Sequence, residues 1–170
     1  MILYHGSSIE IDTIDLGKCR PYKDFGKGFY TTPILEQAWK MAERTVRIYK
    51  EGRPCVTAFS VDDRLFSDAA LKVRQFNLPD NEWAMFVVNN RNREFHDIQN
   101  LNCNTDAKYD IVIGPVANDD IAALIDVFIA GLISDDALTR ELTFRELNSQ
   151  FSFHTGKSAA GLVKTEVFHG

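Results

Sequence analysis

Apolar residues recur along the chain with two periods, one typical of helices and one typical of strands. The helical period is clearest over residues 35–49, where apolar side chains recur at three- and four-residue spacings with charged ones between them. We predict an amphipathic helix there, ended by Gly52 and prevented from resuming by Pro54. Further helices are expected over residues 81–90, 121–130 and 137–147, each preceded by a residue typical of a helix N-cap.

Short apolar or alternating runs predict about seven strands. They lie at residues 2–5, 29–32, 56–61, 71–76, 109–115, 150–154 and 162–168. The run at 109–115 is almost wholly apolar and ends in Gly-Pro, which indicates a strand in the middle of a sheet. Two of the later helices follow one another with no strand between them, which favours the α+β class over a doubly wound sheet. No linker or repeat interrupts the 170 residues, so we expect a single domain over 1–170.

Composition narrows the compartment and the partners. A net charge of −5 argues against a broad electrostatic surface for nucleic acid or membrane, but it leaves a local site open. Cys19, Cys55 and Cys103 are far apart and form no metal-binding spacing, so we predict no metal and a reducing, cytoplasmic environment. No run approaches the roughly 18 apolar residues of a membrane span, and no signal segment is recognised.

Two glycine-containing stretches carry the candidate chemistry. The first strand ends in His5-Gly6-Ser7, and a later strand is entered through Asp24-Phe25-Gly26-Lys27-Gly28-Phe29-Tyr30. A tight glycine turn that leads into a strand with a tyrosine can hold a flat ring against bare backbone. Taken alone, the second stretch is better explained as a plain turn before a strand.

Together the two stretches resemble the ADP-ribosyltransferase superfamily, in its His-Tyr-Glu branch of diphtheria-toxin-like enzymes and poly(ADP-ribose) polymerases. The resemblance covers most of the chain and implies two small antiparallel sheets, split apart, with flanking helices and NAD in the cleft between the sheets. A late strand, Ser149-Gln150-Phe151, falls where the third functional residue is expected. Gln150 therefore stands where the family carries a glutamate.

The resemblance implies a role for each matching residue. His5 would hydrogen-bond a ribose hydroxyl, the backbone of Gly6 would bind the nicotinamide carboxamide, and Tyr30 would stack on the nicotinamide ring. The absence of a side chain at Gly6 would serve that backbone contact. Ser7 or Ser8 would contact a ribose or a phosphate. The other cofactor-binding candidates are Gly28, Phe29, Thr31 and Arg91.

Arg91 and Gln150 leave alternatives open. An arginine suits a pyrophosphate contact or a structural ion pair, and we favour the ion pair. Gln150 can hold a ribose hydroxyl but cannot act as a base. With His5, Tyr30 and Gln150 as catalytic candidates, the resemblance implies an NAD-dependent mono-ADP-ribosyltransferase. Related bacterial proteins are often toxins or conflict-system effectors, so an acceptor protein or nucleic acid and a small neutralising protein are expected partners. An NAD glycohydrolase and a catalytically silent NAD- or ADP-ribose-binding module remain alternatives.

Overall fold

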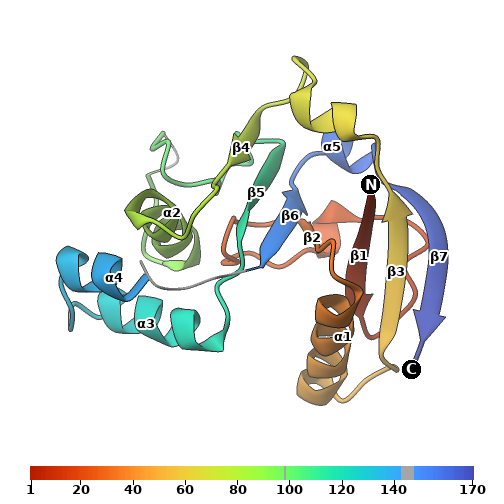
Figure 1. Ribbon diagram of the computed structural model, residues 1–170, viewed down its shortest axis with the longest axis horizontal. Coiled ribbons are helices and arrows are strands. Elements are labelled where there is room, and N and C mark those ends of the chain that lie inside the picture. Colours follow the sequence, from red (N-terminus) through yellow and green to blue (C-terminus); the bar gives the residue numbers. More distant parts are fainter. Residues whose placement is uncertain (98, 143–147) are drawn as a thin grey trace.

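The computed structural model describes residues 1–97, 99–142 and 148–170. Within these residues seven strands form two sheets, and helices pack against both, which confirms the α+β class. Figure 1 shows one sheet at the right, the other in the middle, and most of the helices at the left.

The smaller sheet is antiparallel and has the strand order β1–β3–β7. Its strands are β1 (Ile2–Ser7), β3 (Cys55–Ser60) and β7 (Val163–His169). Since β3 is the middle strand, β1 is an edge strand and turns one side towards the second sheet.

The larger sheet has the order β2–β6–β5–β4 and is mixed. Its strands are β2 (Phe29–Thr31), β6 (Ser149–Phe153), β5 (Ile111–Pro115) and β4 (Val73–Gln75). β5 is buried along its whole length between β6 and β4, as predicted for a central strand. The expectation of two purely antiparallel sheets was wrong, because β4 runs parallel to β5. A parallel pair needs a long crossover, and the chain between the two strands supplies one that contains a helix.

Five α-helices lie within the described residues: α1 (Leu35–Tyr49), α2 (Asn81–Arg91), α3 (Asp119–Ile129), α4 (Asp135–Leu142) and α5 (Gly156–Ala159). Two short 3₁₀ segments, η1 (Leu16–Lys18) and η2 (Asp63–Ser67), lie in loops. α1 has the predicted bounds, whereas the last five positions of the predicted helix 137–147 lie outside the described residues. α5 was not predicted.

Three groups of buried side chains hold these elements together. α2, α3 and α4 pack on one face of the larger sheet, around Trp83 and Phe86. A second group fills the space between the sheets and includes Leu3 and Phe59 from the smaller sheet with Phe153 from the larger. α1 packs on the smaller sheet.

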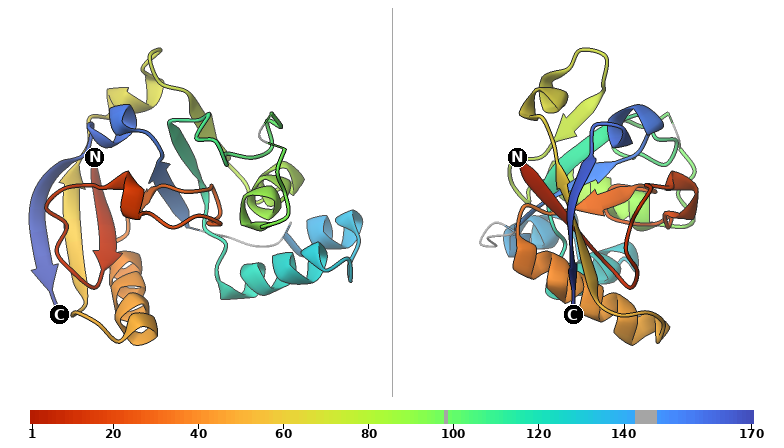
Figure 2. Two further views of the ribbon diagram at one scale, coloured as in Figure 1. Left: turned by 180° about the vertical axis from the view of Figure 1, so that it is seen from behind. Right: turned by 90° about the vertical axis from the view of Figure 1, so that its right-hand side faces the viewer.

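The left view of Figure 2 shows the long segment between β1 and β2 crossing the side of the molecule away from the viewer of Figure 1.

The two sheets meet at one backbone bridge. The N–H groups of Tyr4 and Thr32 donate to each other's carbonyl oxygens, at N–O distances of 2.8 and 2.9 Å. Continuing this antiparallel register would place Gly6 opposite Tyr30, but within the described residues the bridge stops at Tyr4 and Thr32. β1 and β2 therefore diverge beside the predicted site.

Candidate functional site

His5 lies on β1 and is held against β2. Its ring stacks on Phe29 with centroids 4.2 Å apart, and its Nδ1 lies 2.7 Å from the carbonyl oxygen of Tyr30. A carbonyl oxygen only accepts, so Nδ1 carries a proton and the neutral ring keeps a lone pair on Nε2. Burial lowers the pKa of His5, against the opposing effect of the hydrogen bond to Tyr30. The predicted histidine is thus fixed to the backbone of the predicted tyrosine.

Gly6 has two separate structural properties. A Cβ at this position would lie 1.9 Å from the carbonyl oxygen of Ala38, so helix packing alone requires glycine here, a reason different from the one expected. Peptide groups alternate in direction along a strand. Since Tyr4 turns its N–H and C=O towards β2, Gly6 turns its own towards the same side, where β1 and β2 diverge. A donor and an acceptor therefore face this space side by side.

Tyr30 is fixed at both ends. Its hydroxyl donates to the carbonyl oxygen of Gly26 at 2.7 Å and accepts from the N–H of Phe25 at 2.9 Å, which closes the glycine turn. Burial, with a contribution from the charge of Asp24, raises the pKa of Tyr30 well above its usual value of 10. The hydroxyl is therefore protonated and occupied, which leaves the ring of Tyr30 as the part that can meet a ligand.

Gln150 lies in a buried polar group with Asp24 and Arg91. Its Nε2 donates to Oδ2 of Asp24 at 2.9 Å and to the carbonyl oxygen of Pro115 at 3.3 Å. Oδ1 of Asp24 accepts from Nε and Nη2 of Arg91, both at 2.9 Å. Arg91 thus forms the favoured ion pair. Oε1 of Gln150 has no hydrogen-bond partner in the described residues, so this oxygen can accept from a ligand.

Tyr30 and Gln150 share one face of the larger sheet. Tyr30 pairs with Ser152 on β6, and side chains two residues apart on a strand point to the same face.

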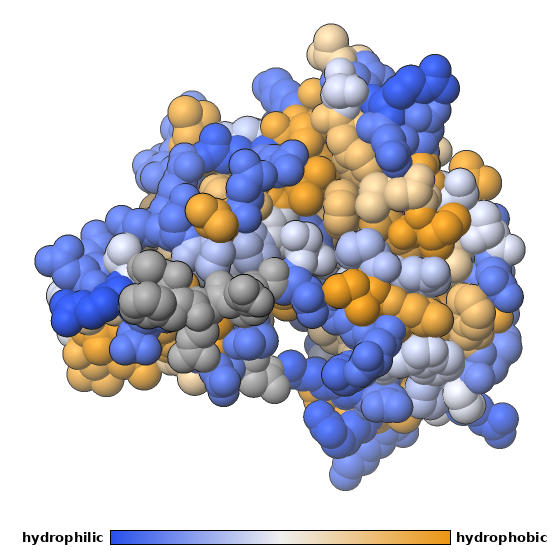
Figure 3. Space-filling view, in the orientation of Figure 1, coloured by the Kyte–Doolittle hydropathy of each residue, from blue (hydrophilic) through white to orange (hydrophobic). Residues whose placement is uncertain are grey.

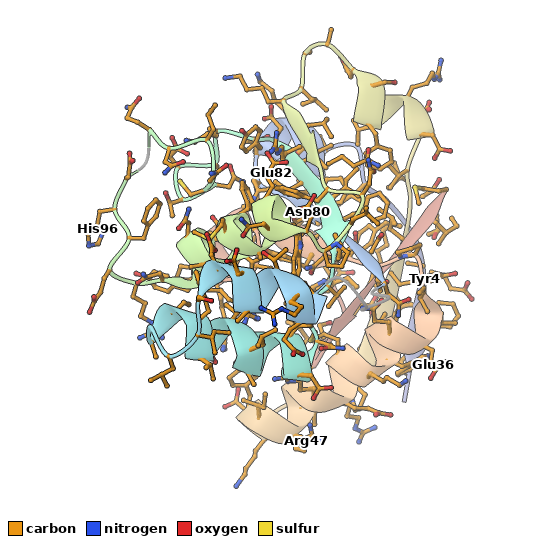
Figure 4. All side chains as sticks on the ribbon, turned by 60° about the vertical axis from the view of Figure 1, so that its left-hand side comes forward. Tyr4, Glu36, Arg47, Asp80, Glu82 and His96 are labelled. Carbon is orange, nitrogen blue, oxygen red and sulfur yellow. The ribbon has the colours of Figure 1, made fainter. Side chains whose placement is uncertain are left out.

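Figure 3 shows an opening through the molecule between α1 and α3. Figure 4 shows Tyr4, which packs against α1, on the side of the molecule away from α2.

The remaining predicted residues do not turn their side chains to this face. Phe29 and Thr31 are buried on the opposite face of β2, and the hydroxyl of Thr31 donates to the carbonyl oxygen of Phe151 at 3.2 Å. The buried hydroxyl of Ser7 donates to the carbonyl oxygen of Ile9, two residues further along the chain. A Cβ on Gly28 would lie 2.6 Å from Nδ1 of His154, so this glycine makes room for a histidine.

His154 is a core residue rather than a member of the site. Its Nδ1 donates to the carbonyl oxygen of Lys27 at 2.8 Å, and its Nε2 lies 2.8 Å from the hydroxyl of Ser152. Burial lowers the pKa of His154 to about 4. The ring therefore supports the glycine turn in its neutral form.

Comparison with known proteins adds the family. Residues 1–163 match the family described as "Protein of unknown function (DUF3990)". The chain belongs to the DUF3990 family. No curated protein and no solved structure matches it. The match includes His5, Tyr30, Asp24, Arg91 and Gln150, so the whole site lies inside the DUF3990 domain.

The DUF3990 site as described has no metal-binding group. Within residues 1–97, 99–142 and 148–170, no cluster of three or more His, Cys, Asp or Glu side chains is placed to hold a metal ion. In the same residues no helix is long and apolar enough to cross a membrane.

Asp24 is the site residue to which the sequence assigned no role. Its side chain accepts hydrogen bonds from Arg91, Gln150 and the N–H of Ala117, the last at 3.3 Å. These partners are distant in sequence, so no local pattern reveals them. The one available signal was Arg91, because an arginine that is largely buried needs a carboxylate partner.

Proposed function

We propose that this DUF3990 protein is an NAD-dependent mono-ADP-ribosyltransferase. The observation that carries the proposal is the divergence of β1 from β2 at Gly6 and Tyr30, with His5 fixed to the Tyr30 carbonyl beside it. A flat amide-bearing ring placed there would meet the N–H and C=O of the half-buried Gly6 and the ring of Tyr30. Ring stacking of this kind contributes about 0.5–1.5 kcal/mol beyond buried area.

The ribose next to that ring would meet two acceptors. In the proposed complex, Oε1 of Gln150 accepts from one hydroxyl on the Tyr30 face of the sheet. Nε2 of His5, whose ring stacks on Phe29, accepts from another at the edge between β1 and β2. Holding the sugar by its hydroxyls fixes the reacting carbon in place, which is the main contribution that positioning can make.

The transfer step breaks the bond between C1′ of the ribose and the nicotinamide nitrogen. The electron pair leaves with nicotinamide, and a nucleophile of the acceptor forms the new bond to C1′ and releases its proton. Gln150 cannot take that proton, and both oxygens of Asp24 are occupied by Arg91 and Gln150. The proton passes to water or to a group of the acceptor, which fits transfer of single ADP-ribose units.

Two further aspects of the proposal come from the sequence resemblance. The activity would be that of a toxin or conflict-system effector, with a small neutralising protein as partner. The three free cysteines agree with a cytoplasmic location.

A catalytically silent NAD- or ADP-ribose-binding module is the second candidate. It is favoured by the way Gln150 is held, because its amide is fixed by the Pro115 carbonyl and by Asp24, whose two oxygens already accept hydrogen bonds from Arg91 and Gln150. Such a site would bind the dinucleotide and leave its glycosidic bond intact.

The test measures nicotinamide release and ADP-ribose adducts separately. The purified protein is incubated with NAD, alone and with a cell lysate, and analysed by chromatography and mass spectrometry. Release together with a macromolecular adduct is the expected result. Release without any adduct would identify a glycohydrolase, and binding by calorimetry without release would identify the silent module.

Tyr30 supplies the variant for this test. Tyr30→Ala removes the stacking ring and is expected to raise KM for NAD about two- to tenfold or to abolish binding. Tyr30→Phe keeps the ring and should bind NAD like the wild type. Tyr49→Ala, which removes an exposed tyrosine from α1, is the matched control. Equal effects of Tyr30→Ala and Tyr49→Ala would contradict the placement of the nicotinamide ring.

A further inference from the structure

A cavity of about 220 Å³ lies beside the glycine turn and is lined in part by Gly26 and Lys27. Lys27, Arg93 and His96 line it, together with the aromatic rings of Tyr22 and Phe95. None of His5, Tyr30 or Gln150 lines it, so it is distinct from the proposed NAD site.

The cations of this cavity are not neutralised. Among the described residues, the cationic side chains of Lys27 and Arg93 form no ion pair, and the guanidinium of Arg93 lies 5.2 Å from the centre of the Tyr22 ring. The acidic residues of the neighbouring loop, Glu94, Asp97 and Asp106, do not line the cavity. A concentration of positive charge in a chain of net charge −5 indicates an anionic ligand at this place.

The aromatic rings of Tyr22 and Phe95 indicate which class of anion would bind. Nucleotides combine a phosphate with a flat base, and proteins that bind single strands pair cationic side chains with aromatic stacking platforms. Tyr22 is 45% exposed, so its ring is accessible. An acidic peptide would satisfy the cations and leave the two rings unused. A cavity of this size is below the range of about 300–1,000 Å³ usual for ligand pockets, so only a small part of a longer chain would enter it.

The cavity is also adjacent to the proposed reaction. The carbonyl oxygen of Gly26 accepts from the Tyr30 hydroxyl, while the same residue forms part of the cavity wall. Asn90, which also lines the cavity, precedes the Arg91 that holds Asp24. A ligand bound in the cavity would be separated from the ring of Tyr30 by the glycine turn at Gly26.

We infer that this cavity binds a nucleotide unit of a single-stranded nucleic acid, which is the acceptor for ADP-ribose. The role of the nucleic acid as acceptor rests on the proposed function. Its binding in the cavity does not depend on NAD. Lys27 and Arg93 would contact the two phosphates that flank this unit in the strand, one each, and Tyr22 or Phe95 would stack on its base.

The test is fluorescence anisotropy with short labelled single-stranded RNA and DNA oligonucleotides, without NAD, at several salt concentrations. Two phosphate contacts predict a slope of log K against log salt of about −1.4 for the wild type and about −0.7 for Lys27→Ala or Arg93→Ala. Each variant should bind about tenfold more weakly. Arg47→Ala is the control, since Arg47 is exposed on α1 and Figure 4 shows it far from His96.

The outcomes separate this inference from the proposed function. Weaker binding and a smaller slope in Lys27→Ala and Arg93→Ala, with Arg47→Ala unchanged, support the cavity. Equal behaviour of all three variants, or displacement of the oligonucleotide by polyglutamate but not by a free nucleotide, would overturn it. Failure of nicotinamide release with intact oligonucleotide binding would count against the proposed function alone.

Discussion

At the scale of single residues, Asp24 determines how the site is held. Its carboxylate accepts from Arg91 on α2, from Gln150 on β6 and from the backbone after β5. A buried carboxylate is stable only when its lone pairs are occupied in this way. Any change at Gln150 is therefore also a change at Asp24.

Gln150→Glu is expected to make stability depend on pH. The introduced carboxyl would face Asp24, and it can replace the amide as a donor only when it is protonated, so its pKa in the folded state is raised. Stability of the variant should match the wild type near pH 4 and fall below it by about 1–3 kcal/mol at pH 7. NAD binding should persist because an oxygen still occupies the place of Oε1.

Urea denaturation across this pH range measures the effect. Gln75→Glu serves as control, because the substitution introduces the same charge at an exposed position of β4. A difference between Gln150→Glu and the wild type that does not vary with pH would exclude the contact with Asp24.

His154 gives a second prediction with a pH dependence. Its pKa is lowered from 6.5 to about 4 in the folded state, so the unfolded chain binds a proton first as the pH falls. Stability should therefore decrease between pH 6.5 and pH 4, by about 3 kcal/mol from this group, since each pKa unit is worth about 1.4 kcal/mol. His154→Gln removes the titrating group, so its unfolding free energy should fall less steeply over the same interval. Parallel curves for the two proteins would refute the assignment.

At the scale of secondary-structure elements, the contact between α1 and β1 depends on Gly6. A Cβ there would meet the helix backbone at Ala38 and Ala42, which cannot move aside as a side chain can. Gly6→Ala is expected to cost about 3 kcal/mol of unfolding free energy. Gly156→Ala meets nothing within 4 Å and should change stability by less than about 0.5 kcal/mol. Chemical denaturation of both variants tests this, and similar costs would show that the helix does not lie so close.

The elements that the sequence predicted are those whose information is local. The bounds of α1 follow from its apolar face, but the expectation that Gly52 ends it was wrong, because Lys50 in the left-handed region is the C-cap. The direction of the β4–β5 pair does not follow from a local pattern, because pairing is decided by contacts between distant segments. α5 has only four residues, and its signal was the capping box of Thr155 and Ser158 rather than any periodicity.

The residues of the candidate site also fall into those that a local motif reveals and those that depend on contacts between distant segments. His5, Tyr30 and Gln150 were found from their places in short motifs, and the structure brings them to neighbouring strands. The burial of Phe29 and Thr31 could not be read from the motif, because it depends on which face of β2 meets the core between the sheets. Asp24 escaped notice because all its partners are more than sixty residues away in the chain.

At the scale of the whole molecule, the side chains between the two sheets predict that residues 1–170 unfold as one unit. Leu3 and Phe59 from one sheet pack with Phe153 from the other, so neither sheet keeps its core alone. The two tryptophans report on different parts, Trp39 on α1 and Trp83 on the buried side of α2. In Trp39→Phe and in Trp83→Phe, the remaining tryptophan's fluorescence and the far-ultraviolet circular dichroism should therefore share one urea midpoint. Separate midpoints within either variant would indicate two independently folding parts.

Because Nδ1 of His5 holds a proton, the protonation state of Nε2 determines which chemical groups can hydrogen-bond this ring at a given pH. The neutral ring presents a bare nitrogen on its other side, and the protonated ring presents an N–H at the same point. A carboxylate suits only the second form, and an ammonium group suits only the first. A sugar hydroxyl can give or receive a hydrogen, so it would remain bound through an acid shift that expels the ammonium group.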